Sequence, residues 1–259
     1  MTIATLVRET DAIGGEVIIA NHGGDTAQLS ALLGAHTSAV QIATIPSDSY
    51  FSKTCAMNVG GFLSRHDVLF FCDCDIIPEP GTVAHLAAAV RNRSDAFATI
   101  KRVRESDPPG DKAGHITRFD YCMRLTTRTG RQVCIDNHAQ DLPAGYRNAP
   151  GLLCVRRAHF IEIRGYNSRL AGWGWEDQDM ICRLTLGLGL QRVDEGEVIH
   201  VSHSDAERTF AYEDTDRWIS RDRAFRRSLA RYDEGDFLGT LDSDVSDSLD
   251  ILSSSPPRS

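Results

Sequence analysis

Three short apolar segments in the first part of the chain alternate with segments of helical spacing. Residues 16–20, 40–45 and 67–72 predict strands, and residues 26–34 and 53–64 predict the helices between them. This order, with nearly uninterrupted apolar strands, is typical of a parallel sheet covered by helices on both faces. Ligands of such sheets bind outside the carboxyl ends of the strands. The pattern therefore predicts an α/β fold with a mostly parallel central sheet and a ligand site at that edge.

The rest of the chain is less regular, although further elements can be predicted from the spacing of its apolar residues. These elements are a strand at 96–103, a polar loop at 104–114 and helices at 82–91, 157–163 and 177–188. Residues 214–232 are rich in arginine and predict a helix whose charged face is solvated, in preference to a binding patch. Residues 239–259 are rich in Ser and Asp and predict a disordered tail.

The charge and hydropathy of the chain exclude two classes of partner. The formal net charge is −8 at pH 7, whereas duplex nucleic acids are bound by clustered Lys and Arg, so we expect no nucleic acid partner. The longest apolar run, residues 68–72, is far shorter than the roughly 20 residues that cross a bilayer. The N-terminal residues do not resemble a secretion signal. We expect no membrane span.

The seven cysteines form an odd set without a CxxC pair. A chain of 259 residues does not need disulfides to be stable, so we expect free thiols with a structural role in a reducing cytoplasm. The predicted location is therefore cytoplasmic.

Asp73 and Asp75 directly follow the third predicted strand, separated by Cys74. Two carboxylates at this place can hold a divalent cation that is bound to a diphosphate, because Mg²⁺ and Mn²⁺ prefer oxygen ligands. Such triplets also occur by chance in solvated loops. Their position at the expected mouth of the sheet favours the metal-binding interpretation.

A second segment sets two indoles in a glycine-containing loop before a cluster of acids. It reads Gly172-Trp173-Gly174-Trp175-Glu176-Asp177-Gln178-Asp179. An aromatic face can cover the apolar side of a sugar ring, while a carboxylate accepts hydrogen bonds from the hydroxyls and can remove a proton. The alternative is that the indoles are core residues and the acids cap the following helix. Both interpretations can hold together.

His200 and His203 lie three residues apart after a strand-like run. Imidazoles are common metal ligands, so this pair would complete a site with the two aspartates. The alternative is a structural or solvated pair, and the presence of three such segments in one chain favours the functional interpretation.

At these residues the chain resembles glycosyltransferases of the GT-A fold, in particular the β-1,4-galactosyltransferase and chondroitin-polymerase-like group. The resemblance covers residues 16–205. The segments that carry it are Tyr50-Phe51-Ser52-Lys53, Met57-Asn58-Val59-Gly60, residues 71–78, Gly165-Tyr166, residues 172–179 and residues 200–203. It implies a Rossmann-like nucleotide-sugar-binding domain over 1–238, with a donor half at about 1–105 and an acceptor half at about 106–238.

The resemblance also implies a role for each matched residue. The expected donor-binding residues are Phe51 near uracil, Lys53 near the diphosphate, Asn58, Asp73 and Gly151. The expected metal ligands are Asp75, His203, His200 and Asp73, where His200 matches a methionine of the animal galactosyltransferases. Trp173, Trp175 and Glu176 are expected to bind the acceptor, and Asp177 is expected to be the general base.

The chain differs from the family pattern at three places: after the first strand, at Lys53, where arginine is usual, and at residues 146–150. The resemblance therefore does not identify the donor sugar. The function implied is an inverting, Mn²⁺- or Mg²⁺-dependent transfer of a hexose or N-acetylhexosamine from a UDP-sugar to an acceptor hydroxyl. The acceptor is a saccharide, glycolipid, peptide or small molecule. The alternatives are a retaining enzyme of the polypeptide N-acetylgalactosaminyl type, a nucleotidyltransferase, and an inactive glycan-binding homologue.

Overall fold

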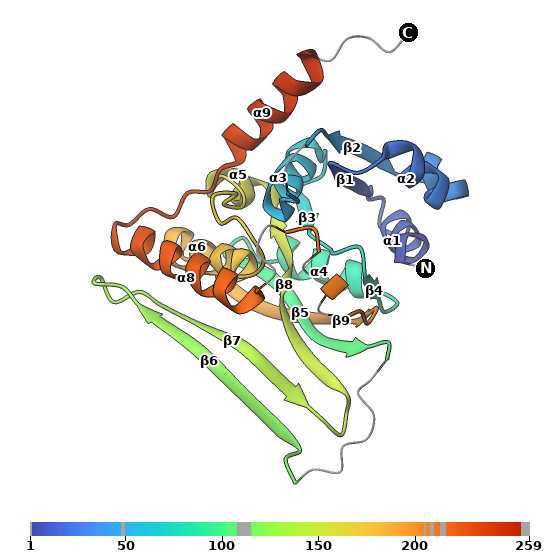
Figure 1. The fold of residues 1–259 in the computed structure, drawn as a ribbon. Helices are drawn as coiled ribbons and strands as arrows, with labels where there is room; N and C mark the ends of the chain where they lie inside the picture. Colours follow the sequence, from blue (N-terminus) through green and yellow to red (C-terminus); the bar gives the residue numbers. More distant parts are fainter. Residues whose placement is uncertain are drawn as a thin grey trace.

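A seven-stranded sheet forms the centre of the molecule (Figure 1). The computed structural model describes residues 2–47, 50–107, 115–204, 206–207, 210–212 and 216–254. The strands are paired in the order β4, β9, β5, β8, β7, β6, and β3 also pairs with β8. They are β3 (Val68–Phe70), β4 (Ile76–Pro78), β5 (Ala96–Glu105), β6 (Arg118–Thr126), β7 (Gln132–Asp141), β8 (Tyr146–Arg156) and β9 (Gln191–His200).

The prediction of a mostly parallel sheet is wrong for this central sheet. Only β5 and β9 pair in parallel, whereas the other pairings are antiparallel. The first two predicted strands, β1 (Ile18–His22) and β2 (Gln41–Ile45), do pair in parallel, but as a separate two-stranded sheet. The difference arises in the second half of the chain, where β6, β7 and β8 run back and forth as long antiparallel strands.

Helices cover both faces of the central sheet, as the α/β pattern predicts. They are α1 (Thr2–Asp11), α2 (Thr26–Leu33), α3 (Lys53–Leu63), α4 (Thr82–Arg91), α5 (Arg157–Glu162), α6 (Glu176–Leu188), α8 (Arg217–Asp233) and α9 (Leu241–Ser254), with a 3-10 helix at Gly34–Ala39. Strand β5 shows the two faces, because Phe97 joins the core under α6 whereas Ala98 and Ile100 join the core under α4.

The Ser- and Asp-rich segment after residue 239, for which disorder is predicted, forms a helix over residues 241–254. Its first three apolar residues, at 241, 245 and 249, recur every four positions, and Leu241 and Val245 are buried in the core that contains α6. The regular spacing of a few apolar residues therefore outweighs the polar composition of this segment. The last five residues of the predicted tail lie outside the described residues.

Among the helices that the structure describes, none is both long and apolar enough to cross a membrane.

Candidate active site

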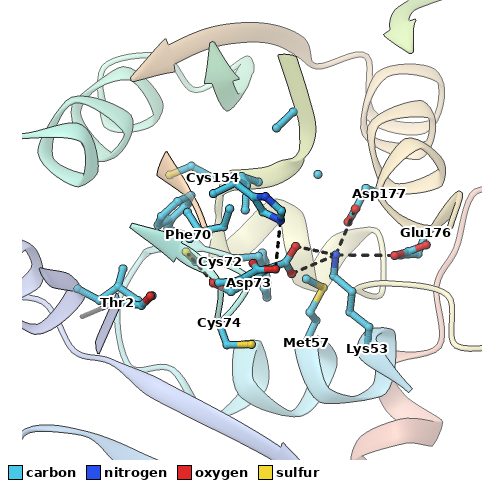
Figure 2. A pocket seen from close by; sticks show the side chains of 18 of the residues that line it. Thr2, Lys53, Met57, Phe70, Cys72, Asp73, Cys74, Cys154, Glu176 and Asp177 are labelled. Atoms are coloured by element: carbon cyan, nitrogen blue, oxygen red, sulfur yellow. Dashed lines mark hydrogen bonds and ion pairs between the residues drawn. The ribbon is translucent and has the colours of Figure 1, made fainter. Parts of the chain in front are cut away.

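A single large cavity collects most of the residues that the sequence singles out. Its volume is about 1790 Å³, and it is lined by the carboxyl end of β1, the loop after β3, the start of α6 and the end of β9. Figure 2 shows part of this cavity, with Lys53 facing acidic side chains from two sides. The residues on its wall that were predicted to be functional are Phe51, Lys53, Asp73, Asp75, Gly151, Trp173, Trp175, Glu176, Asp177, His200 and His203.

Lys53 is the first residue of α3, a helix capped by the hydroxyl of Ser52, which accepts a hydrogen bond from the Cys55 backbone N–H. Its Nζ lies 3.1 Å from Asp73 Oδ1, 3.2 Å from Asp177 Oδ2 and 3.7 Å from Glu176 Oε1 (Figure 2). Burial alone would lower the pKa of this ammonium, but the surrounding carboxylates raise it well above its ordinary value. Lys53 is therefore a fixed positive charge between Asp73 and Asp177.

Asp177 lies in the first turn of α6, which begins after Trp175 in the left-handed conformation (φ 74°). Its carboxylate rests against Gly151 of β8, where a Cβ atom would lie 2.3 Å from Asp177 Oδ2. Burial raises the pKa of Asp177 to about 7, although the nearby Lys53 acts in the opposite direction. Oδ1 of Asp177 is buried without a hydrogen-bond partner among the described residues. A carboxylate with these properties can act as a general base near neutral pH.

Asp75, His200 and His203 form the only cluster of predicted metal ligands within the described residues of the cavity. Asp75 Oδ2 lies 3.0 Å from His203 Nε2 and 3.3 Å from His200 Nε2. Burial would raise the pKa of Asp75, but the hydrogen bonds from the two histidines outweigh it and lower the pKa. Strand β9 positions His200 beside β4, which follows Asp75 directly.

Glu105 is a neighbour of this cluster that the sequence does not reveal, and it contacts His200. Its Oε2 lies 2.6 Å from Nδ1 of His200, and its Oε1 accepts a hydrogen bond of 2.7 Å from Nε of Arg147. The strand β5 is two residues longer than predicted, so Glu105 lies at the end of a strand and not in the predicted polar loop. A carboxylate that holds one imidazole nitrogen leaves the other nitrogen facing the metal site.

This cluster fits a divalent cation in two respects. One carboxylate and two imidazoles are donors that suit first-row ions such as Mn²⁺, and their ligand atoms all lie within 4.8 Å of one another. In addition, Oδ1 of Asp75 is buried without a hydrogen-bond partner among the described residues. Asp73 does not join the cluster, because its carboxylate pairs with Lys53.

The two indoles of the Gly-Trp-Gly-Trp segment have different environments. Trp175 is only 3% exposed and packs edge to face on Phe225, with ring centroids 4.6 Å apart. The prediction that Trp175 binds the acceptor does not fit this location, and the alternative of a core residue does, although one edge reaches the cavity wall. Trp173 is half-buried on the cavity wall, and the guanidinium of Arg217 lies 5.8 Å from its ring centroid.

Two predicted donor-binding residues also differ in their placement. Phe51 lies in an aromatic wall with His22 and Tyr212, with ring centroids 5.9 Å and 5.8 Å away, where a flat base can pack. Asn58 is fully buried and does not line the cavity. Its amide bonds to the Tyr166 backbone and to Asp244, so Asn58 joins α3 to the segments around these two residues.

Comparison with known proteins finds similarity to glycosyltransferases. Residues 135–204 match the protein-family model for the N-terminal domain of galactosyltransferase, and this range contains Asp177, His200 and His203. The structure is similar to that of GalNAc-T7 crystallised with UDP, GalNAc and Mn²⁺, with a TM-score of 0.59 and 14% identity over 88% of this chain. The chain spans 44% of that protein.

A second comparison is with the catalytic domain of Drosophila β1,4-galactosyltransferase 7 in complex with xylobiose. It has 15% identity, covers 77% of this chain and 75% of that chain, and has a TM-score of 0.36. The family match and the GalNAc-T7 fold confirm the predicted resemblance to GT-A glycosyltransferases.

Proposed function

We propose that this chain is a metal-dependent glycosyltransferase that moves a hexose or an N-acetylhexosamine from a UDP-sugar to an acceptor hydroxyl. One observation carries the proposal: the Lys53 ammonium pairs with both Asp177 and Asp73. The pKa of Asp177 is about 7, as a base needs. Asp73 lies two residues before Asp75, which forms the metal-binding cluster with His200 and His203. A base and a cation site in one cavity are the two parts that such a transfer needs.

In this proposal Asp75, His200 and His203 hold Mn²⁺, or Mg²⁺ in its place. GalNAc-T7, whose fold this chain shares, was crystallised with UDP and Mn²⁺, which supports this choice. When bound, the cation neutralises the charge that develops on the leaving diphosphate. Lys53 and Asp73 lie between the cluster and the base, and we assign to Lys53 a contact with the diphosphate and to Asp73 a contact with the donor.

The remaining residues bind the substrates and move the proton. Phe51 covers one face of the uracil, and Gly151, which lines the cavity beside Asp177, contacts the donor sugar. Trp173 packs on the acceptor, and Glu176 accepts a hydrogen bond from it. Asp177 removes the proton from the acceptor hydroxyl, which then attacks the anomeric carbon as the bond to the diphosphate breaks.

We further propose that the reaction inverts the anomeric configuration, because Asp177 supplies a base on the acceptor. Nuclear magnetic resonance of the product separates the two outcomes: a β-linked product from an α-linked UDP-sugar agrees with inversion, and an α-linked product contradicts it.

We also propose a cytoplasmic location and a single transferase domain at residues 1–238. All seven cysteines are free, which supports a reducing compartment. Because α9 packs into the same core as α6, we extend this domain to include that helix.

A screen of UDP-sugars tests the proposed class directly. We expect at least one UDP-sugar to raise the melting temperature in the presence of Mn²⁺, and Mn²⁺ to be needed for release of UDP. The control is Asp75→Asn, which should bind the cation weakly and release no UDP. Stabilisation without UDP release would favour the inactive glycan-binding alternative, and release of pyrophosphate from a nucleoside triphosphate would favour a nucleotidyltransferase.

A further inference from the structure

Helix α8 (Arg217–Asp233) concentrates positive charge in a chain whose net charge is −8. It contains six arginines and two aspartates. Figure 1 shows α8 beside α6, with the hairpin of β6 and β7 below the two helices. Positive charge is thus concentrated on one surface helix, and the orientation of that helix determines which arginines face solvent.

The inner face of α8 is fixed by buried polar contacts to α6. Ser220, Ala224, Ser228 and Tyr232 are buried at intervals of four residues. The hydroxyls of Ser228 and Tyr232 donate hydrogen bonds of 2.9 Å and 2.6 Å to Oδ1 of Asp179 in α6. Because this face is tied to α6, the opposite face of α8 is held toward solvent.

That opposite face combines exposed apolar residues with arginines, and we call it the Trp218 face. It consists of Trp218, Ile219, Asp222, Arg223, Arg226 and Arg227, which together line one shallow groove. Trp218 is 53% exposed and Ile219 is 63% exposed, and the three arginines are exposed as well. Asp222 pairs with Arg226 at 2.7 Å, which leaves the face with a net positive charge.

The Trp218 face continues into the active-site cavity. Trp218 lines both the groove and the cavity, and Phe210, which is 82% exposed, lines the cavity as well. Arg221 passes beside Gly174, where a Cβ atom would lie 3.2 Å from the Arg221 side chain. A partner that binds the Trp218 face would therefore lie next to the side of the cavity that Trp173 lines.

We infer that the Trp218 face docks on an anionic lipid bilayer, so that the proposed transferase acts on an acceptor that a lipid holds at the membrane surface. This inference rests on the proposed function. An exposed tryptophan and an aliphatic side chain beside several arginines are the residues that bind the interface of an anionic membrane. Charge complementarity favours an anionic bilayer as the partner of this face, because the face is positively charged. The rest of the chain is acidic and would be repelled from such a bilayer, so this face would be the one that turns toward it.

Co-sedimentation of the full chain with vesicles tests the docking. We expect binding to vesicles of phosphatidylglycerol and phosphatidylcholine in equal amounts, little binding to phosphatidylcholine alone, and weaker binding at high salt. Replacing Arg223, Arg226 and Arg227 by glutamine should lower the partition coefficient by about 100-fold, because each arginine near such a surface contributes about a factor of five. Ile219→Ser should also weaken binding.

The matched control replaces three exposed arginines outside α8, Arg65, Arg118 and Arg124, by glutamine. It removes the same charge from other surfaces, so vesicle binding should fall by less than about three-fold if the Trp218 face is the surface that docks. Equal losses in both triple variants, or equal binding to neutral vesicles, would overturn the docking. So would binding of the Trp218 face to duplex DNA or to an acidic protein with no binding to vesicles.

Transfer assays separate this inference from the proposed function. The triple variant of Arg223, Arg226 and Arg227 should keep the Mn²⁺-dependent release of UDP that the unmodified chain shows with a water-soluble acceptor. Vesicle binding without any UDP release in the unmodified chain would contradict the proposed function alone. UDP release without vesicle binding would contradict the docking alone.

Discussion

Nζ of Lys53 lies 3.2 Å from Oδ2 of Asp177, and the same ammonium lies 3.1 Å from Oδ1 of Asp73. One side chain at the start of α3 thus connects the loop after β3 with the first turn of α6, which are more than a hundred residues apart in sequence. The contact joins the predicted donor half to the predicted acceptor half. It also sets the charge around the proposed base.

The pH dependence of catalysis should report the pKa of Asp177, which burial raises to about 7. A general base acts only when it is ionised, so kcat/KM should rise with pH through about 7 and level off above it. Lys53 lowers this pKa, so Lys53→Met should move the rise to higher pH in addition to weakening donor binding. An unchanged pH profile in Lys53→Met would show that another group limits the rate.

Gly151→Ala should disturb the base without touching the donor loop. The new Cβ atom would lie 2.3 Å from Asp177 Oδ2, so the carboxylate must move. We expect kcat to fall by about 100-fold, because a displacement of this size misaligns the reacting groups. Gly60→Ala is the matched control, since its Cβ would lie 3.6 Å from its nearest neighbour in the same cavity wall and fits without displacement. Similar kinetics in the two variants would contradict the role of Gly151.

Glu105→Gln should weaken the metal site although Glu105 is not one of its predicted ligands. Glu105 holds Nδ1 of His200 at 2.6 Å and so directs Nε2 toward Asp75. Loss of such a partner should lower the affinity for Mn²⁺ by roughly 10–100-fold. Electron paramagnetic resonance of free Mn²⁺ measures this directly. Glu197→Gln on the neighbouring strand is the control, and an equal loss there would point to a general effect of charge.

Asn58→Ala should reduce stability and leave donor affinity unchanged. The substitution leaves the backbone N–H of Tyr166 and the carboxylate of Asp244 without this partner in a buried site. We expect the free energy of unfolding to fall by about 3 kcal/mol, which lowers the melting temperature by roughly 6–12 °C. Asn92→Ala, at an exposed helix end, should have little effect. A loss of UDP affinity without a loss of stability would restore the predicted donor contact.

The sequence predicts those parts of the fold that depend on local patterns. The strands near residues 18, 41 and 68 and the helices that follow them are found within a few residues of their predicted ends, because apolar spacing is a local signal. Strand direction depends on partners far away in the chain. In strand β6 apolar residues occupy every second position, at Phe119, Tyr121, Met123 and Leu125, which is a strand pattern. Its antiparallel pairing with β7 depends on the partner strand, which the local pattern does not identify.

The site follows the same division. A common property of five candidate residues is that each lies at or soon after the end of a strand or in the first turn of a helix, which a local pattern can reveal, and all of them line one cavity: Asp73, Asp75, Asp177, His200 and His203. Glu105 was not predicted, because its role depends on its contact with the imidazole of His200 on the neighbouring strand and not on its own neighbours in sequence.

A similar limit applies to Trp175 and Asn58. Both belong to segments that resemble the family, but only packing distinguishes a residue that contacts substrate from one that supports the residues that do.

The most direct test of the central claim is transfer by Asp177→Asn with Mn²⁺ and the UDP-sugar that the screen identifies. The variant keeps the size of the side chain but cannot accept the proton. The account predicts that binding of the UDP-sugar, measured by calorimetry, stays within about three-fold of the unmodified chain, while product formation in a single turnover falls by about 1000-fold or more. Product formation at the unmodified rate would contradict the assignment of Asp177 as the base.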